Sequence, residues 1–273
     1  MIKLDTDLLK MDCRKVEDDI TRFIVTVVSE AKADGVLLGL SGGIDSSVVA
    51  TLCVKALGKE RVLGLFMPAT FTPTEDQVDA KAIAEDLGIK TCLIPLSLIV
   101  DKFLDTVPLT VRNRVAVGNV LARMRMVVGY FFANSLNYLV AGTGDRSELL
   151  VGYFTKHGDG GVDFLPIGHL YKTQVKELAR HLNLPSRIVN KPASPQLWDG
   201  QRATDEIPVD YPILDLILYE LFDAKASINH IVKRFGIRRE IVEAVQQRFE
   251  RSRHKRTVPP VPMSLGEHPR KST

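Results

Sequence analysis

Three glycines, three serines and one aspartate lie close together in a short segment that could bind phosphate. The segment reads Gly39-Leu40-Ser41-Gly42-Gly43-Ile44-Asp45-Ser46-Ser47. Glycines let a backbone approach an anion closely, and serine hydroxyls donate hydrogen bonds. A helical pattern follows at once, so free N–H groups of a new helix would point to the same place. The segment therefore predicts a site for phosphate or pyrophosphate.

The aspartate of this segment indicates which kind of phosphate would bind. A Walker-type loop, G-x-x-x-x-G-K-[S/T], carries a lysine, whereas this segment has none and contains Asp45. A carboxylate among phosphate donors is typical of a Mg²⁺ site, because magnesium takes one or two carboxylates plus phosphate oxygens. We therefore expect Mg-ATP. The alternative is a tight strand-to-helix turn, with Asp45 as a residue favoured at the start of a helix.

A second segment is also rich in groups that bind polar ligands. It reads Ala141-Gly-Thr-Gly-Asp-Arg-Ser-Glu148, followed by Gly152-Tyr-Phe-Thr-Lys-His-Gly-Asp-Gly-Gly-Val-Asp163. Glu148 offers another carboxylate for magnesium, and Lys156 offers a cation for an anionic substrate. A solvated surface loop would have a similar composition, so this segment alone leaves both interpretations open.

Alternating strands and helices must position these residues. Apolar runs predict strands at residues 36–40, 61–67, 90–94 and 138–141, with a short fifth strand near Phe164 and Leu165. Helical patterns cover residues ~12–34, 48–57, 74–87 and ~112–135. This order predicts a doubly wound α/β fold, with a mainly parallel five-stranded sheet and helices on both faces. Ligands of such sheets bind beyond the carboxyl ends of the strands, so the loops after strands one, two and four should form the site.

Helices dominate the last third of the chain, at about residues 172–182, 211–222, 226–235 and 239–251. We expect one domain over residues 1–258, with an α/β core at 12–170 and a helical extension at 171–258. Residues 191–210 are rich in Pro, Gly and polar side chains, and we interpret them as a lid over the nucleotide. The Pro-rich residues 259–273 suggest a flexible tail.

Composition excludes several classes of protein. The net charge of +3 is too small to argue for nucleic-acid binding. No apolar run reaches the ~18 residues that span a bilayer, and the acidic N-terminus does not resemble a signal peptide, so a cytoplasmic protein is expected. Cys13, Cys53 and Cys92 are widely spaced without a C-x-x-C pair, which indicates reduced thiols rather than disulfides or a zinc site.

Several dispersed strings resemble the ammonia-dependent NAD synthetases, a family of the ATP pyrophosphatase superfamily. They are the S-G-G-x-D-S string at 41–46, G-N-V-L-A-R-M-R-M at 118–126, the Gly-Thr pair before Glu148, F-T-K-x-G-D-G-G-x-D at 154–163, Lys172, and His254-Lys255-Arg256. The resemblance runs from residue ~12 to ~258 with the motifs in the family's order. It implies a Rossmann-like fold and a homodimer with the substrate at the interface, near the helix that contains Arg123.

The resemblance also implies a role for each matching position. ATP would be held by Gly39, Leu40, Ser41, Gly42, Gly43, Ile44, Asp45, Ser46, Thr143, Lys172 and Ser194. Magnesium would be held by Asp45 and Glu148. The substrate, nicotinate adenine dinucleotide (deamido-NAD), would be held by Arg123, Lys156, Asp163, His254 and Lys255. Considered alone, each could be a surface residue, and Lys172 would be a cation poorly placed at a helix start.

The implied reaction is an amidation in two steps. ATP adenylates the nicotinate carboxylate, and ammonia then displaces AMP to give NAD. Asp45, Lys172 and Asp163 are the residues expected to act in catalysis, Asp163 as a hypothetical aid to deprotonating ammonium. The chain has no room for a glutaminase domain before residue 39, so free ammonia is the expected donor, although a separate glutaminase subunit stays possible.

The sequence departs from the common bacterial form of the family. Gly144-Asp145-Arg146-Ser147 replaces Asp-His-Ala-Ala, and the lid differs in length, as in archaeal members. Two other interpretations stay open: an ATP pyrophosphatase acting on a different acid, and a regulatory module that binds ATP without turnover.

Overall fold

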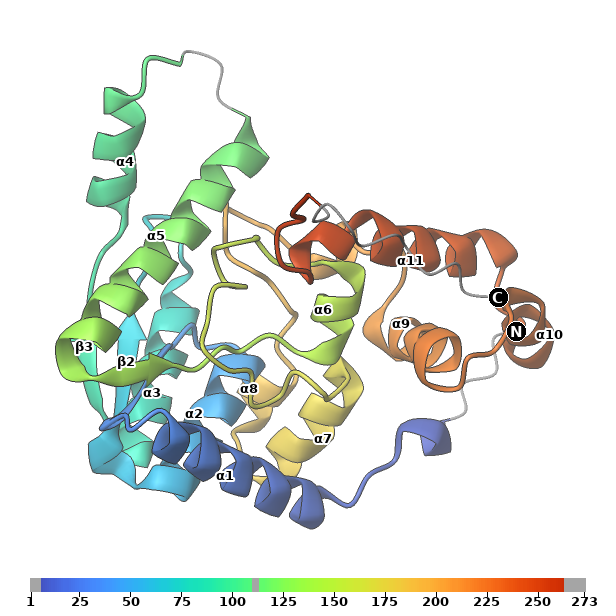
Figure 1. Ribbon diagram of the computed structural model, residues 1–273, viewed down its shortest axis with the longest axis horizontal. Helices are drawn as coiled ribbons and strands as arrows, with labels where there is room; N and C mark the ends of the chain where they lie inside the picture. The colour runs from blue at the N-terminus through green and yellow to red at the C-terminus, as the bar shows by residue number, and fades with distance from the viewer. Residues whose placement is uncertain (1–5, 110–112, 263–273) are drawn as a thin grey trace.

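A four-stranded parallel sheet forms the centre of the protein in the computed structural model, which describes residues 6–109 and 113–262. The strands are β1 (Gly35–Gly39), β2 (Val62–Phe66), β3 (Lys90–Leu93) and β4 (Tyr138–Val140), in the order β3-β2-β1-β4. β1 pairs with both β2 and β4, so it is a central strand. The glycine-serine segment that follows β1 therefore begins at the middle of the sheet edge. Figure 1 shows strands β2 and β3 of this sheet among the helices.

Helices cover both faces of this sheet, as its continuous apolar strands require. Val36 and Leu38 of β1 pack into one core with helices α1 (Cys13–Glu30), α2 (Ile44–Leu57) and α7 (Lys172–His181). Leu37 points to the opposite face, where it packs with Ala133 of α5 (Arg114–Leu136). Alternation of side chains along a strand separates the two cores. The doubly wound α/β prediction is confirmed.

The prediction of five strands is wrong for the described residues. Phe164 forms an isolated parallel bridge with Ala141 instead of a strand. Gly142 N donates to Phe164 O at 2.9 Å, and Asp163 N donates to Val140 O at 3.0 Å. Pro166 comes two residues later and has no N–H for a longer ladder. The contact therefore fixes the loop after β4 without extending the sheet.

Four further helices surround the core, and local chemistry explains where one of them ends and where another begins. They are α3 (Thr74–Leu87), α4 (Ser97–Thr106), α6 (Arg146–Val151) and the short α8 (Ser186–Val189). α3 ends at Gly88, which has a left-handed φ of +65°, as expected from the sequence. α6 begins with a capping box, in which Asp145 and Glu148 each bind the other's backbone N–H. This box fixes Glu148 relative to the loop after β4.

Helix α5 has an apolar surface that faces away from the sheet. By length and composition it could cross a membrane, but a helix that packs on a soluble core passes the same test. Gly118, Leu121 and Gly129 are among its buried residues, whereas Val127 and Phe131 are exposed. One such helix is weak support for a membrane protein, and the absence of a membrane stays a prediction.

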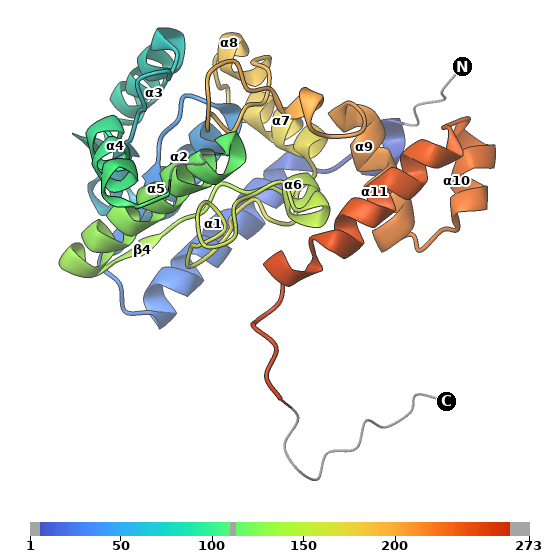
Figure 2. The same cartoon turned by 90° about the horizontal axis from the view of Figure 1, so that it is seen from above.

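The helical extension packs beside the sheet domain through a second core. It contains α9 (Tyr211–Leu218), a π-helical turn (Tyr219–Asp223), α10 (Ile228–Phe235) and α11 (Arg239–Arg251). Figure 2 shows these helices together at one end of the molecule, with α9 next to α7. Their apolar side chains form a cluster that also includes Val151 of α6 and Tyr171, the residue before α7. That residues 1–258 behave as one domain stays a prediction.

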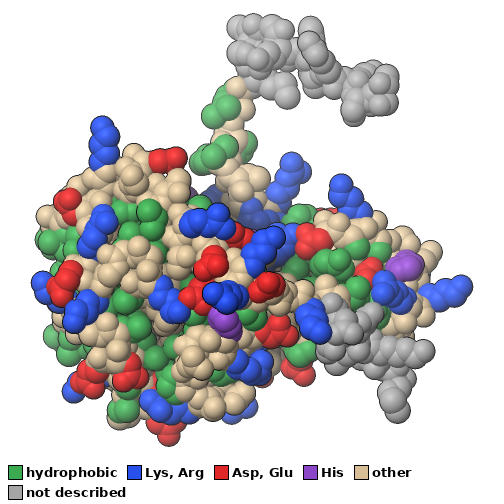
Figure 3. Space-filling view, turned by 90° about the horizontal axis from the view of Figure 1, so that it is seen from below, with side chains coloured by type: hydrophobic (Ala, Val, Ile, Leu, Met, Phe, Trp, Pro, Cys, Tyr) green, Lys and Arg blue, Asp and Glu red, His purple; other side chains and the backbone are tan. Residues whose placement is uncertain are grey.

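On the face drawn in Figure 3, basic and acidic side chains are interspersed, without one large region of a single sign. Residues 259–262 are exposed and have no helix or strand. The rest of the predicted tail, 263–273, lies outside the described residues.

Candidate active site

A pocket of about 620 Å³ lies at the carboxyl ends of β1, β2 and β4. Ser41 lines it after β1, Met67 after β2 and Thr143 after β4. These are the three loops that the sequence predicted, and they meet because the strands are parallel and adjacent. The segment 152–162, the loop at 193–206, α5 and α3 supply most of the remaining wall.

The glycine-serine segment forms a tight turn into α2. Ser46 Oγ and Ser47 Oγ donate to Gly43 O at 3.1 and 2.8 Å, and Gly43 N donates to Ser41 Oγ at 3.2 Å. Gly43 is the N-cap of α2 and no side chain caps this helix, so its first N–H groups are free to bind an anion. Gly42 has a φ of +76°, and a Cβ there would lie 2.1 Å from Asp76 O.

Lys172 lies at the centre of a group of three carboxylates. Its Nζ atom is 2.8 Å from Asp45 Oδ2, 2.6 Å from Asp145 Oδ2 and 2.9 Å from Glu148 Oε1. The lysine side chain is 1% exposed. The ring of Tyr211 lies beside it, with its centroid 5.3 Å from Nζ. A cation at the start of a helix is unfavourable because of the helix dipole, and the three carboxylates compensate the charge of Lys172 at this position.

Burial and neighbouring charges shift the pKa values of Glu148, Asp145 and Lys172. It raises the pKa of Glu148 well above its usual range, and the neighbouring charge of Asp145 raises it further. Burial raises the pKa of Asp145 too, against the pull of Lys172. For Lys172, burial acts to lower the pKa, but the three carboxylates outweigh it and raise the pKa well above its usual range. The lysine therefore stays protonated.

Hydrogen bonds from two other helices fix the start of α7 and so the position of Lys172. Lys172 N donates to Ser147 Oγ at 2.9 Å, and Ser147 Oγ donates to Asp215 Oδ1 at 2.6 Å. The other oxygen of Asp215 accepts from Thr173 N at 2.8 Å. Burial raises the pKa of Asp215 to about 6. α6, α7 and α9 thus meet at one buried polar contact behind the cluster.

Ion pairs fix the beginning of the 191–210 loop beside the glycine-serine segment. Lys191 Nζ lies 2.6 Å from Asp76 Oδ1 and 2.5 Å from Asp79 Oδ2 on α3, and it donates to Gly42 O at 3.0 Å. Gln196 Nε2 donates to Asp76 Oδ2 at 2.6 Å. The root of the loop and the phosphate turn therefore share a contact with α3.

The middle of this loop packs against α5 and the 152–163 segment. The Arg114 guanidinium lies 4.8 Å from the Trp198 ring centroid. A Cβ on Gly118 would lie 2.9 Å from Leu197 Cβ and 3.1 Å from a carbon of that ring, so a larger residue would require the loop to shift. Further along, Tyr153 Oη donates to Glu206 Oε1 at 3.0 Å. The loop thus closes one side of the pocket.

Comparison with known proteins decides the family. The model of the family described as NAD synthase matches residues 16–259. The chain belongs to this family. NH(3)-dependent NAD(+) synthetase from Pyrobaculum aerophilum is 48% identical over 253 residues, which cover 92% of this chain and 93% of that protein. The protein of the same name from Hyperthermus butylicus is 49% identical, with 94% of this chain and 93% of the relative covered.

Solved structures of similar fold agree with this assignment. NMN synthetase from Francisella tularensis has a TM-score of 0.82 and 32% identity, covering 93% of this chain and 99% of that chain. NH3-dependent NAD synthetase from Campylobacter jejuni has a TM-score of 0.79 and 32% identity, covering 93% of this chain and 100% of that chain. The NAD synthase fold therefore extends over nearly the whole chain.

Most of the residues expected to hold ATP lie at the pocket. Those that line it are Gly39, Leu40, Ser41, Asp45, Ser46, Thr143 and Ser194, together with Glu148. Gly42, Gly43 and Ile44 shape the turn behind the lining without being part of it. Lys172 lies behind Asp45 and Glu148 and reaches both.

The residues expected to hold the dinucleotide are more dispersed. Lys255 lines the pocket, and its Nζ donates to the carbonyls of Gly152 and Phe154 at 2.7 and 2.5 Å. Arg123 is exposed on α5, where its Nη2 donates to Lys156 O at 3.3 Å. His254 is exposed on the 3-10 turn Arg253–Lys255. Arg123, Lys156 and His254 are not part of the pocket lining.

Asp163 lies outside the pocket lining as well. Its Oδ2 accepts from Val140 N at 2.7 Å, and its Oδ1 accepts from Tyr130 Oη at 3.0 Å. Both oxygens thus attach the loop after β4 to the sheet and to α5. This geometry favours a positioning role over proton transfer.

Two residues of the site were not assigned from the sequence. Asp145 joins the Lys172 cluster, and the only signal was its position three residues before Glu148, as in a capping box. Lys191 forms ion pairs with Asp76 and Asp79 of α3, which lie more than a hundred positions earlier in the sequence. No local pattern predicts such pairs.

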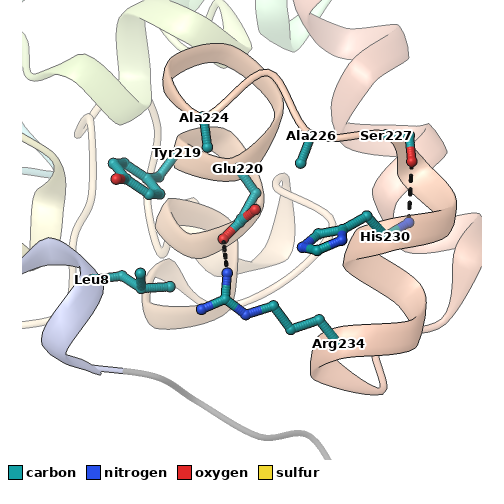
Figure 4. Close-up of a pocket in the computed structure, with 8 residues that line it drawn as sticks. All are labelled: Leu8, Tyr219, Glu220, Ala224, Ala226, Ser227, His230 and Arg234. Carbon is teal, nitrogen blue, oxygen red and sulfur yellow. Dashed lines mark hydrogen bonds and ion pairs between the residues drawn. The ribbon is translucent and has the colours of Figure 1, made fainter.

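A second hollow lies in the helical extension, between the π-helical turn and α10 (Figure 4). Its charged groups already have partners, since Arg234 Nη1 donates to Glu220 Oε1 at 3.1 Å. Ser227 Oγ accepts from His230 N at 3.2 Å and caps α10. These contacts are explained by packing of the extension.

Proposed function

We propose that this member of the NAD synthase family is a ligase that amidates deamido-NAD with free ammonia, using ATP and giving NAD, AMP and pyrophosphate. The observation that carries the proposal is the meeting of the phosphate turn with Asp45, Glu148 and Lys172 at one pocket. ATP is needed because a carboxylate is a poor acceptor for ammonia: its carbon is electron-rich and its leaving group would be oxide. Adenylation supplies a leaving group.

Magnesium is proposed as the metal, and the acidic residues fit it. Ligand oxygens of Asp45, Asp145 and Glu148 lie within 4.8 Å of one another. Asp45 Oδ1 is buried and has no hydrogen-bond partner. Magnesium prefers such oxygens together with phosphate, and when bound it would neutralise charge on the departing pyrophosphate.

The protein's own groups would supply binding and orientation. The free N–H groups at the start of α2 and the hydroxyls of Ser41 and Ser46 would hold the phosphates of ATP. Lys172 would add a positive charge, which the phosphate turn itself lacks. The 191–210 loop would act as a lid and keep water from hydrolysing the acyl-adenylate. Ser194 lies on this loop and would contact the nucleotide.

A homodimer is proposed, because several of the residues expected to hold deamido-NAD lie outside the pocket lining. Arg123 and Lys156 are joined to each other on the surface beside α5. The neighbouring α4–α5 surface is apolar: Leu98 is 78% exposed and Phe131 is 68% exposed. Large exposed apolar side chains on neighbouring helices are consistent with an interface between proteins. A partner subunit on α5 would complete the dinucleotide site at these residues. We also propose that the protein is located in the cytoplasm.

The deciding experiment follows NAD and AMP formation by the purified protein with ATP, Mg²⁺ and ammonium. Deamido-NAD, nicotinate mononucleotide and an unrelated carboxylic acid would be supplied in parallel, and glutamine would replace ammonium in a further sample. The mononucleotide is included because of the likeness to an NMN synthetase. NAD formation with deamido-NAD and ammonium is the expected result.

Matched variants make the test specific. Asp45→Asn removes a carboxylate from the site and should abolish AMP release. Asp12→Asn changes the same group at the N-cap of α1, which an asparagine also caps, and should leave the rate unchanged. ATP binding without AMP release from any acid would overturn the proposal in favour of a regulatory module. Preference for the mononucleotide would correct the substrate.

A separate variant tests Asp163. Its proposed aid to deprotonating ammonium requires a carboxylate, whereas a positioning role requires hydrogen bonds. Asp163→Asn with full turnover would remove the catalytic role. A lower turnover that recovers with rising pH would support it, because the fraction of free ammonia rises with pH.

A further inference from the structure

When its three carboxyl groups are ionised, as a bound metal requires, the cluster around Lys172 contains more negative charge than its lysine can balance. Three carboxylates face one ammonium group at 2.6 to 2.9 Å. Lys172 and Asp145 are almost fully buried, with side chains that are 1% and 0% exposed. Unbalanced charge inside a protein is costly unless a further cation shares it. The cluster is therefore suited to a cation of higher charge than the ammonium group.

Asp145 is the source of the excess, and its charge has no use in the local fold. Its Oδ1 caps α6 by accepting from Glu148 N at 2.8 Å. A neutral serine or asparagine would cap a helix about as well. Its Oδ2 has no hydrogen-bond partner and lies against Lys172 Nζ. Within the fold, the negative charge of Asp145 therefore faces only the other groups of the Lys172 cluster.

We propose that Asp145 is a third carboxylate of the magnesium site, and that the Lys172 ammonium occupies the place of the metal while no nucleotide is bound. The inference rests on the proposed function. The same three oxygens cannot surround an ammonium group and a divalent cation together, because like charges would then lie side by side. Arrival of phosphate gives Lys172 another partner and frees the carboxylates for the metal. Lys172 and the metal therefore compete for the carboxylates.

The inference is tested by metal binding without nucleotide or substrate. The full chain is titrated with Mn²⁺, and free Mn²⁺ is followed by its electron paramagnetic resonance signal. Asp145→Asn keeps the cap of α6 but removes the charge, and we expect it to bind Mn²⁺ roughly 10–100-fold more weakly than the unmodified protein. Asp12→Asn is the matched control, since it makes the same change at a helix cap far along the chain, and its affinity should be unchanged.

A second variant tests the competition. Lys172→Met keeps the length of the side chain without its charge, and it should bind Mn²⁺ at least about tenfold more tightly, because the competitor is removed. Asp145→Asn in that background should reverse the gain. If Lys172→Met does not fold, the comparison of Asp145→Asn with Asp12→Asn decides the role of Asp145 by itself, since both retain the lysine.

The results that would overturn the inference are distinct from those that would overturn the function. Equal Mn²⁺ affinity of Asp145→Asn and the unmodified protein would exclude Asp145 as a ligand. Binding by Lys172→Met that is no tighter than normal would exclude competition by the lysine. Neither measurement includes deamido-NAD or ATP, so failure to form NAD leaves both results interpretable.

Discussion

Replacement of Gly42 by alanine should unfold the phosphate turn, and the structure allows the size of the effect to be worked out. Gly42 has a φ of +76°, a conformation that costs about 1–2 kcal/mol for a residue with a Cβ. The new Cβ would also lie 2.1 Å from Asp76 O, a backbone atom of α3 that cannot rotate away. Overpacking of this kind costs about 1–3 kcal/mol. We therefore expect a loss of about 2–5 kcal/mol in the free energy of unfolding.

The neighbouring glycine provides the control. Gly43 has a φ of −86°, and a Cβ there would lie 3.2 Å from Ser41 Oγ, the end of a rotatable side chain. Both substitutions add the same methyl group and restrict the unfolded chain equally, so their difference reports the folded turn. Gly43→Ala should cost less than about 1 kcal/mol.

Urea unfolding of the nucleotide-free protein, followed by circular dichroism, measures both values. The absence of nucleotide matters because a Cβ at either position could also touch bound phosphate. A shift in the unfolding midpoint for Gly42→Ala, with little change in slope, would support the reasoning. Equal destabilisation by the two variants would refute it, since neither the positive φ nor the contact with α3 would then control the turn.

Three further predictions concern the lid and the core. Gly118→Ala places a Cβ 3.1 Å from the Trp198 ring and should weaken the docking of the loop by about 1–3 kcal/mol. The fluorescence emission of the single tryptophan should then shift to the red and be quenched more strongly by acrylamide. Lys191→Met should cost about 1–3 kcal/mol at neutral pH, because Asp76 and Asp79 lose the ammonium group that they share, while Arg187 still pairs with Asp79. Burial acts to raise the pKa of Asp79, but Lys191 and Arg187 together outweigh it and lower this pKa. The stability that these ion pairs contribute is therefore fully present above the unfolded pKa of 3.8 and is lost as the pH falls through the lower folded pKa. Urea midpoints measured across pH should show the variant's deficit shrinking in acid. Burial raises the pKa of Cys53 to about 12, so a thiol reagent at neutral pH should leave this cysteine unmodified until the protein is unfolded, unlike the two less buried cysteines.

Much of the fold followed from local patterns in the sequence. The apolar runs located the four strands, and Gly88 predicted the end of α3 because only glycine adopts that left-handed conformation without strain. The glycine-serine segment predicted the phosphate turn, since the chemistry lies in consecutive residues. The dispersed motifs also identified the family, and the comparisons confirm it.

The tertiary structure decided what depends on distant pairs. Asp45 and Lys172 are 127 positions apart, and their contact exists only because β1 and β4 are adjacent and α7 packs on α2. Asp145 joins them because its helix cap turns one oxygen inward, which the sequence alone does not reveal. The fifth strand was predicted from apolar residues, but its pairing stops after one bridge at Phe164. The sequence by itself determined which groups were available, and the order of strands in the sheet determined which of them share a site.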